Sequence, residues 1–332
     1  MTRLSDGQTK DVKVLIGTVI VIAIPFILTL LSITQPRLPM SVPAEPLLNP
    51  SPHGYTWSLS LFVVPDAVLA WWVLSMHRGL IEKKAFWLTL AILVPTWCLL
   101  DIFLGLTFFR FPNAGASVGH VWGYTFDAGW QKGIPVEEFG FYVFGFIAML
   151  LVYIWSDEYL LAAYKVERPR TAAGIMELVS FHPRSLITGI VLFALGWAYK
   201  AYGPHDYHAG FPGYLLFILS ASIMPSILFY RVAKPFINWR ALMLTLFFIL
   251  FLSLFWEAAV GVPYQWWDYN RGQMIGVFIG AFTGLPLEAV VIWLFATWTT
   301  VIIYETVHTF LRMGIADVET LLASWRTQEP AT

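Results

Sequence analysis

Cysteine, charged side chains and clustered basic residues are all scarce in this chain of 332 residues. The single cysteine, Cys98, lies inside an apolar run, so the sequence offers neither a disulfide framework nor a cysteine zinc site. Charged residues make up 12% of the chain, about half of their share in ordinary globular proteins. Because Lys and Arg are scattered through loops without forming a basic stripe, we expect no nucleic-acid partner.

Apolar residues are abundant instead, at 58% of the chain, and aromatic residues alone reach 17%. A bilayer core about 30 Å thick is crossed by a helix of roughly 20 apolar residues. Eight stretches approach this length, so the sequence predicts an all-α, polytopic transmembrane helix bundle. They run near 12–33, 57–76, 86–109, 134–155, 185–202, 212–230, 241–260 and 285–305.

The distribution of basic residues predicts the orientation of these spans, because short cytoplasmic loops carry most of the Lys and Arg. Counting loops alternately from the N-terminus places 15 of the 20 basic residues on one side. The other side has Arg37, Arg110, Lys132, Lys200 and Arg271. We therefore expect an integral, multi-pass protein of a bacterial cell membrane, in contact with lipid, with both termini cytoplasmic. The first stretch is longer than a secretory h-region and is interpreted as a retained anchor.

Two copies of one pattern follow each other in the chain: an acid near the end of an apolar helix, an aromatic loop, and Pro-x-Glu opening the next helix. The first copy has Asp101, Trp122, Tyr124, Pro135, Glu137 and Glu138, and the second has Glu257, Trp267, Tyr269, Pro286 and Glu288. In the preceding helices, Pro65-Asp66 matches Pro225-Ser226. The copies are four helices apart, which predicts two parallel-repeat halves that meet across a pseudo-twofold axis.

This repeat divides the chain into five expected regions. They are an N-terminal anchor helix with a Pro-rich loop (1–56), a first repeat (57–165), a connector with a linking helix (166–211), a second repeat (212–310) and a cytoplasmic tail (311–332).

Acidic residues in or at the ends of the predicted spans are the strongest functional signal, since ionisable groups are costly there. They are Asp66, Asp101, Glu137, Glu138, Glu257 and Glu288, and no Lys, Arg or His sits in the middle of a span to neutralise them. Carboxyl groups removed from water resist ionisation, so we expect some to be protonated at neutral pH. Proline with a nearby carboxylate also suits the first turn of any helix, but two matched copies favour a functional site.

Aromatic residues surround these acids and, with Glu257 and Asp66, are predicted to bind substrate. They include Phe141, Tyr142, Trp122, Tyr124, Trp267 and Tyr269. An aromatic face stabilises a cation without reacting with it, so such a cavity can hold a carbocation. Simple packing and interfacial anchoring are the alternative roles of these side chains.

Together, the Asp in a span, the Trp-x-Tyr loop, Pro-Val-Glu-Glu-Phe at 135–139 and Leu-Pro-Leu-Glu at 285–288 resemble the integral membrane lycopene cyclases. These carotenoid enzymes occur as two small subunits or as one fused chain, and the resemblance spans residues 57–305. It implies redox-neutral cyclisation of the ψ-ends of lycopene or a related acyclic carotenoid. A carboxylic acid would protonate the terminal double bond, and loss of a proton from the new ring would set the ring type. Other carotenoid-pathway enzymes are possible partners.

On this resemblance, Glu137 and Glu288 are the expected proton-transfer pair, and Glu138 and Asp101 tune or relay the proton. The sequence departs from the family at Ala289, where a second Glu would stand. It contains no Gly-x-Gly, so we expect no flavin, no other cofactor and no metal. Open alternatives are another membrane terpenoid cyclase, a carotenoid hydratase, a proton-coupled transporter and a non-catalytic assembly protein.

Overall fold

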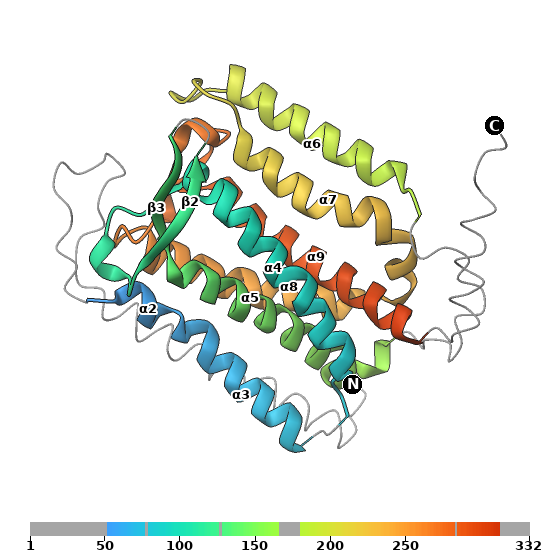
Figure 1. Ribbon diagram of the computed structural model, residues 1–332. Coiled ribbons are helices and arrows are strands. Elements are labelled where there is room, and N and C mark those ends of the chain that lie inside the picture. The colour runs from blue at the N-terminus through green and yellow to red at the C-terminus, as the bar shows by residue number, and fades with distance from the viewer. Residues whose placement is uncertain (1–51, 77–78, 126–127, 166–179, 283, 313–332) are drawn as a thin grey trace, which may run out of the picture.

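The computed structural model describes residues 52–76, 79–125, 128–165, 180–282 and 284–312, and its main elements are helices (Figure 1). The predicted first span, 12–33, and the cytoplasmic tail lie outside the described residues. The seven later spans are each confirmed as a helix that is long and apolar enough to cross a membrane. A helix suits such a sequence because it satisfies its own backbone hydrogen bonds where no water is present.

Helices account for most of the described residues. In chain order they are α2 (Gly54–Ser58), α3 (Ser60–Met76), α4 (Lys83–Phe108), α5 (Val136–Trp155), α6 (Pro183–Tyr202), α7 (Gly213–Ala233), α8 (Trp239–Phe255) and α9 (Leu287–Arg312). Two of them continue as π-helical turns, α5 over Ser156–Leu160 and α8 over Trp256–Gly261. Pro65 and Pro225, the prolines matched in the sequence, both lie inside helices, in α3 and α7.

Helix packing has the same order before and after α6. Helix α3 packs against α5 as α7 packs against α9, and both α4 and α8 contact α5 and α9. Helix α6 lies along the outer side of α7 (Figure 1). The described part of the bundle therefore places α5 and α9 at its centre.

Matched positions of α5 and α9 meet at this centre. Thr300 donates a hydrogen bond from Oγ1 to Sδ of Met149 (3.4 Å), and the two residues are 151 positions apart. The rings of Tyr153 and Tyr304, at the same separation, lie 6.1 Å apart. Glu137 and Glu288 are also 151 positions apart. Helices α5 and α9 therefore contact each other at the residue pairs that the sequence repeat aligns.

Short strands supplement the helices, which the all-α prediction did not include. Strands β2 (His120–Thr125) and β3 (Gly129–Pro135) form an antiparallel hairpin at one end of the bundle (Figure 1). The other antiparallel pairs are β1 (Phe109–Arg110) with β4 (Asp268–Tyr269), and β5 (Phe278–Ile279) with β6 (Leu285–Pro286). Pairing of β1 with β4 joins the loop that follows α4 to the loop that precedes α9.

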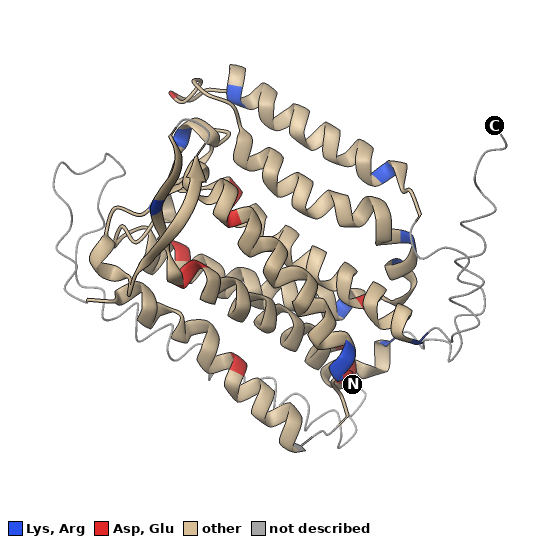
Figure 2. Ribbon diagram, viewed as in Figure 1, with Lys and Arg blue, Asp and Glu red and all other residues tan. Residues whose placement is uncertain are grey.

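Charged positions are unevenly distributed over this fold. Figure 2 shows acidic positions gathered where α4 ends and α5 begins, beside the hairpin, whereas Lys and Arg lie mainly near helix ends and in loops. Of the acids expected to matter, Asp101, Glu137, Glu138, Glu257 and Glu288 are all less than 10% exposed. The bundle thus holds buried acids at the end that carries the strands.

Candidate active site

An apolar cavity lies between α4, α5, α7, α9 and the π-helical turn after α8. Aromatic side chains make up 12 of its 22 lining residues. The charged residues in this lining are Asp101, Glu138 and Glu257, and it contains no Lys, Arg or His. The cavity therefore combines a hydrocarbon-like wall with three acids.

Asp101 enters the cavity from the last turns of α4 and is 4% exposed. It accepts a hydrogen bond from the hydroxyl of Tyr142. One turn later stands Gly105, where an added Cβ would lie 2.4 Å from Oδ1 of Asp101. Glycine at this position thus leaves the space that the carboxyl group occupies. Oδ2 of Asp101 has no hydrogen-bond partner among the described residues.

Glu138 lies in the first turn of α5, where the positive end of the helix dipole favours an acid. Its Oε1 accepts a hydrogen bond from the hydroxyl of Tyr55 (2.6 Å). It also interacts electrostatically with Asp101, which lines the same cavity. Two carboxyl groups that interact in a water-poor site are most stable with a proton on one of them.

Glu257 has more hydrogen-bond donors than the other two acids. Its Oε2 accepts from Nε1 of Trp267 (2.8 Å) and from the hydroxyl of Tyr269 (2.6 Å), and its Oε1 accepts a longer bond from Nε1 of Trp293 (3.4 Å). Hydrogen bonds to its oxygens stabilise the ionised form of a carboxyl group, so these donors offset the cost of burying a charge at Glu257. Burial and the nearby Glu257 raise the pKa of the Tyr269 hydroxyl well above its usual value, which keeps this hydroxyl a donor.

Glu257 lies in the π-helical turn that continues α8. Such turns are frequent at functional sites. Gly261, at the end of this turn, gives room for Trp267, because an added Cβ would lie 1.9 Å from the indole ring. The ring can therefore lie directly under the turn and donate to Glu257.

The two halves support their cavity acids in the same way. Tyr142 stands five residues after Glu137 and donates to Asp101, and Trp293 stands five residues after Glu288 and donates to Glu257. Asp101 and Glu257 were matched in the sequence repeat. The cavity consequently contains one such acid and donor from each half.

Glu137 and Glu288 are buried, but neither lines the cavity. Oε1 of Glu137 accepts from the backbone N–H of Val118 (2.8 Å) and from the hydroxyl of Thr56 (2.5 Å). Oε1 of Glu288 accepts from the backbone N–H of Ile275 (2.5 Å). Each glutamate therefore holds the loop that precedes its own helix.

Lys200 lies beside Glu288 and is only 1% exposed. Its Nζ donates to the carbonyl oxygen of Arg271 (3.2 Å), and it attracts the Glu288 carboxylate electrostatically. The repeat in the sequence did not indicate that this lysine lies near Glu288. Lys200 binds Arg271 and Glu288 binds Ile275, so together they fix the segment from Arg271 to Ile275, which begins two residues after Tyr269.

The predicted substrate-binding residues divide into two groups. Glu257, Phe141, Tyr142, Trp267 and Tyr269 line the cavity. Asp66, Trp122 and Tyr124 do not: Asp66 is buried in α3, and the other two belong to the β2–β3 hairpin, where Trp122 is 60% exposed. The aromatic loops therefore match in sequence but not in position.

Several cavity residues and their supports were not predicted from the sequence. They are Tyr55, Trp97, Tyr214, Phe217 and Trp256. Trp256 could have been found as the neighbour of Glu257, but nothing in the repeat indicates Tyr55 of α2 or Phe217 of α7. Within the described ranges, no group of three or more His, Cys, Asp or Glu is placed to hold a metal ion.

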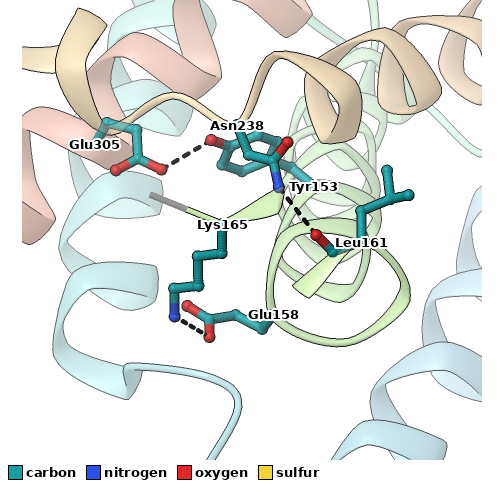
Figure 3. A network of polar contacts seen from close by, with 6 residues as sticks. All are labelled: Tyr153, Glu158, Leu161, Lys165, Asn238 and Glu305. Carbon is teal, nitrogen blue, oxygen red and sulfur yellow. Dashed lines mark hydrogen bonds and ion pairs between the residues drawn. The ribbon is translucent and has the colours of Figure 1, made fainter. Parts of the chain in front are cut away.

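A second polar network lies toward the other ends of α5 and α9 (Figure 3). The hydroxyl of Tyr153 donates to Oε1 of Glu305 (2.8 Å), and Lys165 forms an ion pair with Glu158. Nδ2 of Asn238 donates to the carbonyl oxygen of Leu161 (3.4 Å), while its Oδ1 caps the start of α8. These contacts tie the end of α5 to α8 and α9, far along the helices from the cavity acids.

The fold and cavity define a helix-rich protein with seven helices able to cross a membrane and a buried, acid-bearing aromatic cavity. Comparisons with protein-family models, curated proteins and solved structures find no match to this chain.

Proposed function

We propose that this chain is a multi-pass membrane enzyme that cyclises the ψ-ends of lycopene or a related acyclic carotenoid without net redox change. The observation that carries the proposal is the cavity itself, in which three buried acids face a wall of aromatic side chains with no basic residue in the lining. General acid catalysis needs a positioned proton donor, and a hydrocarbon substrate needs an apolar site. The resemblance to the integral membrane lycopene cyclases points to the same chemistry.

In the proposed mechanism, the pair formed by Asp101 and Glu138 carries the proton. Its O–H bond breaks as a C–H bond forms at the terminal double bond, which leaves a carbocation. The neighbouring double bond attacks this cation and closes the ring, and the charge moves to a ring carbon. A C–H bond of the ring then breaks, its electron pair forms the ring double bond, and a carboxylate of the cavity takes the proton. Atoms and electrons balance, and no oxidant is needed.

Glu257 is the proposed counter-ion of the carbocation. Its three donors favour the carboxylate, and a fixed negative charge stabilises a developing positive charge strongly where water is excluded. The faces of Trp256 and Phe141, whose ring centroids lie 4.6 Å apart, add cation–π stabilisation. A cation held in this way survives long enough for the ring to close.

Glu137 and Glu288 have positioning roles in this proposal, because their contacts hold loops. Ala289, which matches Glu138 in the repeat, is buried and carries no acid. The cavity thus has one carboxyl pair, and we propose that the two ends of a substrate are cyclised one after the other. The membrane orientation with cytoplasmic termini and the additional span 12–33 belong to the same proposal.

Expression in a bacterial host that accumulates lycopene tests the proposed function. We expect a cyclic carotenoid to appear at the expense of lycopene, as measured by pigment chromatography with mass spectrometry. A product of unchanged mass identifies a cyclase, and a product heavier by one water identifies a hydratase. Unchanged lycopene, with the protein verified in the membrane fraction, would contradict the proposal and favour the transporter or assembly alternatives.

The Tyr55→Phe variant tests whether Glu138 is part of the site. Removing the hydroxyl takes away the donor to Oε1 of Glu138 but keeps the ring that stacks on Trp266. Because hydrogen bonds to charged groups contribute about 1.5–3 kcal/mol, we expect ring formation to slow by roughly tenfold or more. Tyr264→Phe, whose ring also stacks on Trp266, is the control and should keep the normal rate. Equal rates in both variants would remove Glu138 from the mechanism.

A further inference from the structure

The cavity is not centred between the two halves. Its lining includes Tyr214 and Phe217 of α7, but no residue of α2 or α3, the elements at the matching place in the first half. In the repeat, α4 matches α8 and α3 matches α7. The gap between α4 and α7 in the bundle therefore corresponds to the gap between α8 and α3. The two sides are built differently.

Large rings close the side between α3 and α8. Phe62 is fully buried and packs edge-to-face on Trp256, with ring centroids 5.4 Å apart, and it stacks on Trp293 at 5.9 Å. In the repeat, Phe62 corresponds to Ser222 of α7, and Trp256 corresponds to Leu100 of α4. Smaller side chains at both positions leave space between α4 and α7 that rings fill on the other side.

Aromatic side chains close the remaining gap between α4 and α7. The ring of Phe217 lies 5.7 Å from Trp97 and 5.5 Å from Phe108. Phe217, Leu100 and Leu104 line the cavity and are half-buried. Their chain neighbours Leu99, Phe103 and Leu216 are exposed, so the three lining side chains stand between the cavity and the outer surface of α4 and α7.

The outer surface beside this gap is apolar as well. Leu99 and Phe103 of α4 are 55% and 46% exposed, and Leu216 of α7 is 40% exposed. In a bilayer these residues face acyl chains, which is where a carotenoid dissolves. A long polyene that places one end at the acids needs an apolar exit for the rest of its length.

We infer that the gap between α4 and α7, defined by Leu100, Leu104 and Phe217, is a lateral portal through which a long apolar chain enters from the bilayer. Phe217 is its movable ring, since side-chain rotation is fast compared with enzymatic turnover. While one end reacts, the unreacted remainder lies in the portal. This inference rests on the proposed function, because it takes the polyene as its substrate.

Cysteine labelling tests the portal. In a Cys98→Ser background, Phe217→Cys is treated with a bulky, lipid-soluble maleimide, and ring formation is measured before and after. Trp57→Cys is the matched control, because Trp57 occupies the corresponding place before α3 and is 71% exposed. We expect labelling at 217 to abolish most ring formation and labelling at 57 to leave it unchanged. Added lycopene should slow labelling at 217 only.

Full activity after complete labelling at 217 would overturn the portal. If Phe217→Cys is inactive before labelling, Leu104→Cys replaces it, with the same expectations. If the unmodified protein forms no ring product at all, the proposed cyclisation fails, and the portal is then judged by lycopene protection alone. Protection at 217 supports a portal for apolar chains, and equal labelling with and without lycopene rejects it.

Discussion

Replacing Glu257 with glutamine is expected to lower the rate of ring formation by roughly 10²- to 10³-fold, the size of the loss when one electrostatic stabiliser of a transition state is removed. The amide has nearly the shape of the carboxylate but carries no charge to stabilise the carbocation. It also presents an NH₂ group to a site where Trp267 and Tyr269 already donate. The rate is measured as cyclic product per amount of protein in the membrane.

Glu138→Gln should have an effect of similar size, since it removes half of the carboxyl pair that holds the proton. The matched control is Glu158→Gln, which changes an acid of the network at the other ends of the helices and should keep the normal rate. If Glu257→Gln and Glu138→Gln both keep the rate of the control, the cavity acids do no chemistry.

Replacing Lys200 with methionine is expected to destabilise the folded protein by about 1–3 kcal/mol, because it leaves the buried carbonyl oxygen of Arg271 without its donor and removes the positive charge near Glu288. Lys200 is 1% exposed and attracts Glu288, so the carboxylate would lose its nearby cation. The midpoint of thermal unfolding in detergent measures this effect.

A double variant separates the charge interaction from packing. Combining Lys200→Met with Glu288→Gln removes both charges, and it should recover much of the lost stability. Lys132→Met, at an exposed lysine of β3, is the control and should leave the midpoint unchanged. A double variant no more stable than Lys200→Met would show that the two side chains do not act as a pair.

Sequence predicted the helices well, because the length and apolar character of a span are properties of the sequence itself. The span expected at 241–260 corresponds to Trp239–Gly261, and the span expected at 285–305 corresponds to Leu287–Arg312. The match of Asp101 with Glu257 also led to two residues that line the cavity.

Adjacent residues on a helix were harder to assign from the sequence. Glu137 and Glu138 differ by one position, which turns a side chain by about 100° around the helix axis. Glu138 consequently faces the cavity, whereas Glu137 faces the loop at Val118. The motif contains both acids and cannot show which of them points inward, since that depends on how α5 packs.

The two aromatic loops, which match in the sequence, differ in structure because they pair with different parts of the chain. Between α4 and α5 the chain pairs with itself as the β2–β3 hairpin, which turns Trp122 outward. In the second half, β4 pairs with β1 of the other half, and this pairing brings Tyr269 to Glu257. A local pattern of aromatic residues carries no information about such long-range pairing.

The origin of the proton added to the substrate tests the central claim most directly. Membranes that contain the protein are equilibrated in D₂O and given less lycopene than protein, so that each site turns over once. If a carboxyl group of the cavity protonates the substrate, mass spectrometry should find one deuterium in each ring formed. Rings formed without deuterium would contradict protonation by an exchangeable acid of the protein.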